Sequence, residues 1–168
     1  MQVFAVSGFS FSGKTFLLEQ LISKLKEEGK SVASIKSTKE DIIAPEGTDT
    51  WRHAQAGANP TLLIGPSTAT MRARGKTAIS KFAKIIDVDY LLLEGFKELE
   101  VPRFWCIGEE IAEEQFSPSN VKAYVVWEGV DLGSSKDGVP IIPNSDIQRL
   151  VAILKEEAID YFSINGIS

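Results

Sequence analysis

Eight consecutive residues near the start of the chain have the types and spacing needed to hold a phosphate chain. They follow the pattern Gly-x-x-x-x-Gly-Lys-Thr and are, in order, Gly8, Phe9, Ser10, Phe11, Ser12, Gly13, Lys14 and Thr15. The glycines permit a tight turn in which successive amide N–H groups face an anion. We expect the Lys14 ammonium to bind phosphate oxygens and the Thr15 hydroxyl to bind Mg²⁺.

The residues on either side of this loop favour the same interpretation. Residues 2–6 form a short apolar run typical of a strand, and from Phe16 onward apolar side chains keep a helical spacing until Gly29. The positive end of that helix dipole would face the bound nucleotide. Phe16, in the first turn of the helix, is expected to lie at the nucleotide as well. The alternative is a glycine turn that joins a strand to a helix without any ligand.

A second candidate lies at the end of a later apolar run. Residues 90–93 show no polar alternation, as expected for a strand buried on both faces, and Glu94 follows them. A carboxylate in this place is expected to serve Mg²⁺, in part through water, or to position an attacking water. Lys14 and Glu94 are therefore the expected catalytic pair, with Thr15 and Glu94 at the metal. The alternative for Glu94 is an ordinary carboxylate at a strand end.

Other polar residues allow two interpretations each. Asp49 is expected to begin a short helix, where it either caps the helix or contacts Mg²⁺ or the nucleotide. Arg72 and Arg74 alternate along an expected strand at residues 68–74 and would suit a phosphate or an acidic partner. The polar loop at residues 36–41 either reaches the phosphate site or forms solvated surface.

Strands and helices alternate along most of the chain, which predicts an α/β fold of the P-loop NTPase type. We expect a mostly parallel, twisted sheet flanked by helices on both faces, with an added strand pair, in one domain spanning residues 1–168. The expected strands are residues 2–6, 31–35, 61–64, 68–74, 90–93, 103–107, 121–126 and 140–142. The expected helices run from the loop to residue 29 and over residues 48–56, 77–86 and 146–162.

Composition narrows the class of protein further. The net charge of −5 argues against general binding of nucleic acid, although residues 50–86 hold six Lys and Arg and no acidic residue. That basic segment suggests a face for an anionic ligand or acidic partner, and the alternative for Lys81 and Lys84 is a solvated helix face. The single Cys106 and single His53 exclude an internal disulfide and a Cys/His metal cluster. With no signal peptide or membrane-length apolar run, we expect a cytoplasmic protein.

Four stretches of the chain resemble the molybdopterin-guanine dinucleotide biosynthesis protein B (MobB) family, from the start of the chain to about residue 107. They are the glycine loop, Lys36-Ser37-Thr38, Asp49-Thr50 followed by Ala56-Gly57-Ala58, and Leu91-Leu92-Leu93-Glu94-Gly95-Phe96-Lys97. The resemblance implies a homodimeric GTP-binding accessory protein, a weak GTPase with GTP and Mg²⁺ as cofactors. It would act beside a molybdopterin guanylyltransferase (MobA), which joins GMP to molybdopterin. It also implies that Asp49 belongs to the nucleotide site.

The sequence differs from the expected patterns in two features, and the properties linked to them are not assigned to this chain. The family usually has a Lys-His-Thr-His-His run where this chain has Lys36-Ser37-Thr38-Lys39-Glu40, so no role of those histidines is transferred. The Asn-Lys-x-Asp element that reads guanine in many GTPases is also missing, which leaves Asp131, Asn144 and Asp146 as candidate partners of the base. The alternative function is a small kinase that passes the γ-phosphate of ATP to a metabolite held by Arg72, Arg74 and Lys76.

Overall fold

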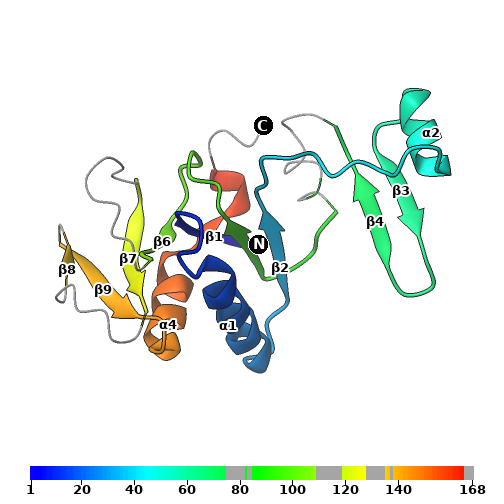
Figure 1. Ribbon diagram of the computed structural model, residues 1–168. Coiled ribbons are helices and arrows are strands. Elements are labelled where there is room, and N and C mark those ends of the chain that lie inside the picture. Colours follow the sequence, from blue (N-terminus) through cyan, green and yellow to red (C-terminus); the bar gives the residue numbers. More distant parts are fainter. Residues whose placement is uncertain (75–81, 83–84, 109–118, 128–134, 137, 165–168) are drawn as a thin grey trace. The chain divides into compact units, whose positions relative to one another are not determined.

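A layered α/β arrangement forms the larger of two compact units into which the chain divides (Figure 1). The computed structural model describes residues 1–74, 82, 85–108, 119–127, 135–136 and 138–164. The larger unit consists of Met1–Ser37 and Asp87–Gly166, and the smaller unit contains Thr38–Ile86. The organisation of residues 1–168 as a single domain stays a prediction.

The framework of the larger unit is a mostly parallel sheet, as the sequence predicts, and β1 is one of its interior strands. The strand order is β2 (Val32–Lys36), β5 (Tyr90–Glu94), β1 (Gln2–Gly8), β6 (Arg103–Cys106), β7 (Val121–Val126), β9 (Val139–Pro143) and β8 (Ser135–Lys136). Neighbouring strands from β2 to β9 are parallel, and β8 is antiparallel to β9. The buried runs of β1 and β5 therefore form adjacent central strands, which brings their carboxyl ends to one edge of the sheet.

The two faces of this sheet are covered differently. Helices α1 (Lys14–Glu27) and α4 (Ile147–Glu157) pack together on one face, against alternate residues of β1 such as Phe4 and Val6. The intervening residues, Val3 and Ala5, face the opposite way, where the apolar neighbours are Leu91, Leu93, Val101, Phe96, Leu99, Ile159 and Tyr161. In the described part of the unit, loop segments and the short 3-10 helix η1 (Tyr161–Ser163) lie on this second face and no α-helix does, although the sequence predicts helices on both faces.

The last helix is shorter than its sequence pattern predicts. We expected a helix over residues 146–162, but α4 ends at Glu157 and Ala158 has an extended backbone, with φ −61° and ψ 140°. The next residues form β10 (Ile159–Asp160), which pairs antiparallel with β1 and places Ile159 opposite Val3. The chain leaves the helix because this pairing packs the partly buried Ile159 on the second face of the sheet.

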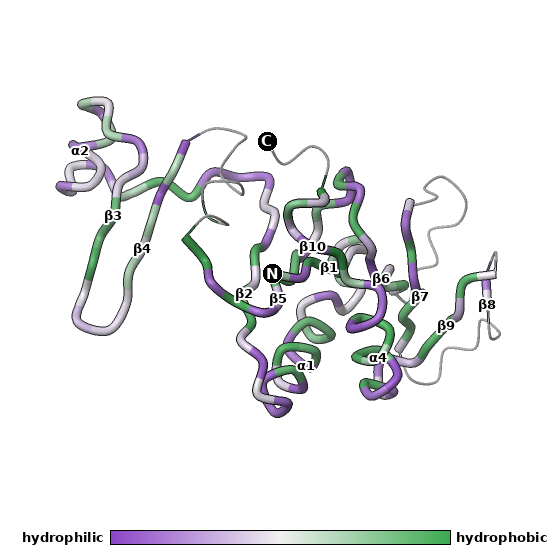
Figure 2. Tube along the Cα trace, turned by 180° about the vertical axis from the view of Figure 1, so that it is seen from behind, coloured by the Kyte–Doolittle hydropathy of each residue, from purple (hydrophilic) through white to green (hydrophobic). Residues whose placement is uncertain are grey.

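The smaller unit contains helix α2 (Asp49–Gln55) and an antiparallel pair formed by β3 (Thr61–Ile64) and β4 (Ala69–Arg72), which is the expected added strand pair. Much of β3 is hydrophobic (Figure 2), and its Leu62, Leu63 and Ile64 are exposed. The expected helix at residues 77–86 lies largely outside the described residues, as do Lys76, Lys81, Lys84 and Asp131. Among the helices that the structure describes, none is long and apolar enough to cross a membrane.

Candidate functional site

The glycine loop lies between the end of β1 at Gly8 and the start of α1 at Lys14. Its last residue, Gly13, has φ +81°, in the left-handed region that favours glycine. The Gly13 carbonyl accepts a hydrogen bond from the Leu17 amide over 3.0 Å, so the helical ladder begins directly after this turn. The indole of Trp127 packs so closely that a Cβ added at Gly13 would lie 2.6 Å from it. Glycine is thus required here for both backbone conformation and space.

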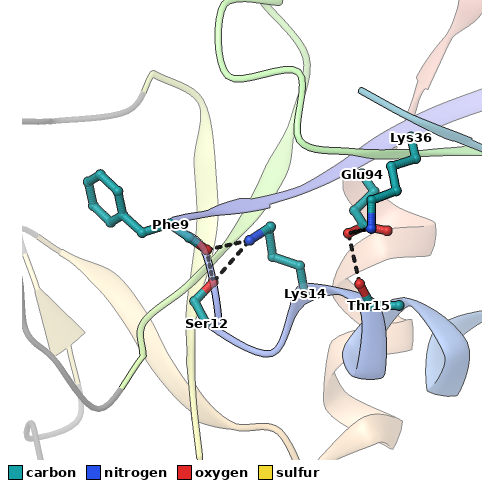
Figure 3. A network of polar contacts seen from close by, with 6 residues as sticks. All are labelled: Phe9, Ser12, Lys14, Thr15, Lys36 and Glu94. Carbon is teal, nitrogen blue, oxygen red and sulfur yellow. Dashed lines mark hydrogen bonds and ion pairs between the residues drawn. The ribbon is translucent and has the colours of Figure 1, made fainter. Parts of the chain in front are cut away.

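The Lys14 side chain folds back over the loop (Figure 3). Its ammonium donates to the Phe9 carbonyl and lies 3.5 Å from the Ser12 hydroxyl, which also donates to the Phe9 carbonyl. Burial lowers the pKa of Lys14, and the positive charges of Lys97 and Lys36 lower it further, while the Glu94 carboxylate raises it. An incoming anion would therefore offset the cost of desolvation and the charge repulsion at this ammonium.

Glu94 lies at the end of β5, between the ends of β1 and β2. One carboxylate oxygen, Oε1, accepts a hydrogen bond from the Thr15 hydroxyl over 2.8 Å and lies 3.0 Å from the Lys36 ammonium (Figure 3). The carboxylate is buried, with 7% of the side chain exposed. The structure therefore brings together three side chains expected at a metal or phosphate, Lys14, Thr15 and Glu94, and adds Lys36 to them.

The donor atoms at this place fit magnesium that arrives with a phosphate ligand. Thr15 and Glu94 offer a hydroxyl and a carboxylate, which are the oxygen ligands that Mg²⁺ prefers. Within the described ranges, no cluster of three or more His, Cys, Asp or Glu could hold a metal ion. Mg²⁺ commonly keeps several waters and takes its remaining ligands from substrate phosphates, so one carboxylate and one hydroxyl suffice for that arrangement.

A buried arginine holds the segment that follows Glu94. Arg103 is fully buried, and its guanidinium donates to the Ser7 hydroxyl over 3.2 Å and to three carbonyls, those of Phe96, Lys97 and Leu99. Ser7 in turn donates to the Gly95 carbonyl over 2.6 Å. Sequence reasoning missed Ser7 and Arg103, although a charged residue at the start of the otherwise apolar β6 was an available signal.

Aromatic rings flank the loop on two sides. Phe9 meets Trp105 edge to face at 5.8 Å, with the Lys97 ammonium 4.3 Å from the Phe9 ring centroid. Phe16, the first residue after Thr15, stacks on Trp127 with the ring centroids 5.4 Å apart. The remaining loop residues Ser10 and Phe11 are exposed. Phe16 is exposed and Trp127 is half-buried, so this pair beside the phosphate loop offers a surface on which a planar ring could stack.

The other residues singled out from the sequence occupy varied places. Asp49 is the first residue of α2 in the smaller unit, and Arg72 ends β4 there. Arg74 lies beyond that strand, where its amide donates to the Asn59 side chain over 2.9 Å. Asp146 caps α4 by accepting from the Arg149 amide over 3.3 Å. Of the three candidate partners of a base, Asn144 lines a small cavity together with Gly13 and Trp127, and Asp131 lies outside the described residues.

A glycine loop between the central strand of a parallel sheet and a helix, with a carboxylate at the end of the adjacent strand, defines the P-loop class of α/β proteins. Within this class, a family model described as MobB, molybdopterin guanine dinucleotide synthesis protein B, matches residues 3–127. The chain belongs to the MobB family, as its sequence motifs suggest.

Individual relatives agree with this assignment. The chain is 32% identical over 114 residues to the molybdopterin-guanine dinucleotide biosynthesis adapter protein of Haemophilus influenzae, covering 64% of each chain. It is 36% identical over 111 residues to a Methanocaldococcus jannaschii protein whose name gives the same adapter role, covering 61% of this chain but only 46% of that protein. A Bacillus subtilis relative with a similar name is 27% identical over 147 residues, or 84% of each chain.

Solved structures confirm the fold. The crystal structure of Bacillus subtilis MobB matches with a TM-score of 0.73 at 24% identity, covering 95% of this chain and 99% of that one. A MobB homologue from Bacillus stearothermophilus matches with a TM-score of 0.65 at 22% identity, covering 92% and 96%. The expected α/β fold with a mostly parallel sheet and an added strand pair is therefore confirmed.

Proposed function

We propose that this chain is a GTP-binding adapter protein with weak Mg²⁺-dependent GTPase activity, which assists the attachment of GMP to molybdopterin. The observation that carries the proposal is the contact of Thr15 with Glu94 beside the Lys14 ammonium, in a chain of the MobB family. The names of its relatives support the adapter role, and the phosphate loop supports the binding of nucleotide.

Each residue has a distinct part in the proposed chemistry. The loop amides and Lys14 bind the phosphates, and Phe16 flanks the nucleotide beside Trp127. Thr15 and Glu94 would hold Mg²⁺, which supplies positive charge to neutralise the phosphates. The described side chains that bond Glu94 belong to Thr15 and Lys36, neither of which is the glutamine or arginine that faster GTPases use. This favours slow hydrolysis that a partner accelerates.

The partners belong to the same proposal. A MobA-like guanylyltransferase is the proposed partner enzyme, with molybdopterin as a further candidate ligand and the cytoplasm as the place of action. We also propose a homodimer, because Leu62, Leu63 and Ile64 expose a continuous apolar strand that a second copy would cover. Light scattering after size exclusion tests the dimer, and a monomeric mass unaffected by concentration would contradict it.

The nucleotide proposal is tested by binding and turnover of the purified chain with Mg²⁺ and either GTP or ATP. We expect slow GTP hydrolysis, whereas fast ATP turnover that requires a small acceptor would instead indicate the kinase alternative. Lys14→Ala should abolish nucleotide binding measured by calorimetry, because it removes the main phosphate contact. Glu94→Gln should retain binding but lose Mg²⁺-dependent hydrolysis. Glu156→Gln, an exposed carboxylate on α4, is the matched control and should behave like the wild type.

A further inference from the structure

Lys36 is an unassigned cation placed at the metal side of the candidate site. It is the last residue of β2, and the parallel pairing of β2 with β5 sets it directly beside Glu94 in register. Its ammonium lies 3.0 Å from Glu94 Oε1, the same oxygen that accepts the Thr15 hydroxyl over 2.8 Å. The carboxylate oxygen expected to serve Mg²⁺ is thus already paired with a cation from this chain (Figure 3).

The two partners of this ion pair lie in unlike environments. The Glu94 side chain is 7% exposed, whereas that of Lys36 is 64% exposed. A buried carboxylate needs a counter-charge, because desolvation of an unpaired charge is costly. A lysine ammonium on a flexible four-carbon chain that is largely in solvent can leave such a contact at little cost in free energy when another cation takes its place beside the carboxylate. Lys36 therefore has the properties of a replaceable counter-ion for Glu94.

The charges around the loop match a particular ligand. Among the described residues, the charged side chains that act on Lys14 are Lys36, Lys97 and Glu94, and with Lys14 itself these four carry three positive charges against one negative charge. A Mg²⁺ complex of a nucleoside triphosphate carries a charge of roughly −2, and the corresponding diphosphate complex about −1. These residues therefore carry more positive charge than a diphosphate complex requires. The additional charge, that of Lys36, lies at the end of the loop that serves the terminal phosphate, beside Lys14 and Thr15.

We propose that Lys36 binds the terminal phosphate of a nucleoside triphosphate and so makes the site selective for triphosphate over diphosphate. This inference rests on the proposed nucleotide-binding function. In the absence of nucleotide, Lys36 keeps the buried Glu94 paired. When triphosphate and Mg²⁺ bind, the Lys36 ammonium moves from Glu94 to the terminal phosphate. The Glu94 carboxylate is then free to interact with Mg²⁺. A diphosphate offers no terminal phosphate there, so Lys36 stays with Glu94.

The test compares the affinities of the wild type, Lys36→Met and Lys36→Arg for two ligands, a non-hydrolysable GTP analogue and GDP, by calorimetry in Mg²⁺. Lys26→Met is the matched control, since Lys26 is an exposed lysine of α1 and the change in net charge is the same. We expect Lys36→Met to weaken the analogue by about 10- to 100-fold, as for loss of a charge-assisted contact, with GDP within about 2-fold of wild type. Lys36→Arg should recover much of the loss.

The outcomes separate this inference from the function on which it rests. If wild-type protein binds neither ligand, the proposed function is wrong and the role of Lys36 falls with it. If wild-type protein binds both but Lys36→Met weakens them equally, Lys36 only orients Glu94 and the inference is overturned. Unchanged affinity for the analogue overturns it as well. Far-UV circular dichroism establishes that each variant is folded, which we expect because the Lys36 side chain is largely exposed.

Discussion

Adding one methyl group at Gly13 tests how the glycine loop is built. In Gly13→Ala, the new Cβ would lie 2.6 Å from Cζ2 and 3.0 Å from Cε2 of Trp127, at a residue with φ +81°. The indole has little freedom to withdraw, because it is half-buried and stacked on Phe16 at 5.4 Å. Gly29 provides the matched control, since its φ is +76° and no atom lies within 4 Å of a Cβ placed there.

The difference between these two substitutions isolates the steric contact. A left-handed conformation costs an alanine about 1–2 kcal/mol, and this term applies to both positions. Overpacking adds roughly 1–3 kcal/mol at Gly13 alone. We therefore expect Gly13→Ala to lower the free energy of unfolding by about 2–5 kcal/mol and Gly29→Ala by about 1–2 kcal/mol. Urea denaturation followed by far-UV circular dichroism measures both values.

Repeating the Gly13→Ala substitution in a Trp127→Ala variant tests whether the indole causes the extra cost. With Trp127→Ala already in place, the contact is absent, so the added cost of Gly13→Ala should fall to that of Gly29→Ala. Equal destabilisation by the two alanines in the wild type would refute the close packing of Trp127 on the loop. An unchanged cost of Gly13→Ala in the Trp127→Ala background would refute it equally.

Three further predictions concern the buried or partly buried side chains of Arg103, Cys106 and Lys14. Arg103→Met should destabilise the protein by about 3 kcal/mol or more in urea denaturation, because it leaves partly buried carbonyls unpaired, whereas the exposed Arg149→Met should cost less than about 0.5 kcal/mol. Burial raises the pKa of Cys106 to about 12, so a chromogenic disulfide reagent at neutral pH should modify it only after unfolding, and rapid modification of native protein would contradict this. Burial lowers the pKa of Lys14 in the unliganded protein, and phosphate would raise it; nucleotide affinity should be full below the unliganded pKa and fall as pH rises through it. Calorimetry at increasing pH should show that the affinity declines at a pH below the usual pKa of lysine. An affinity that does not change with pH would contradict this prediction.

Local pattern was enough to predict the parts of the site that belong to one short stretch of chain. The spacing of Gly8, Gly13, Lys14 and Thr15 identifies the loop, and unbroken apolar runs before Gly8 and before Glu94 identify two buried strands. Since the carboxyl ends of parallel strands share one edge of the sheet, the sequence also predicts that Glu94 lies near the loop. The contact between Thr15 and Glu94 agrees with that expectation.

Other features depend on contacts between residues far apart in the chain. The periodic pattern of residues 146–162 favours one long helix, yet pairing of Ile159 with Val3 ends it at Glu157. The site also gains Lys36, because β2 pairs in register with β5, and it gains the support of Arg103, which no motif marks.

From its sequence alone, then, this protein's class, its phosphate loop and its family could be recognised, because they depend on residue types at fixed local spacing. Only the tertiary structure decided which side chains share the Glu94 carboxylate and which glycine faces the Trp127 indole. Those contacts join residues tens of positions apart, and their formation depends on strand register and on the burial of two sheet faces, which local propensity does not specify.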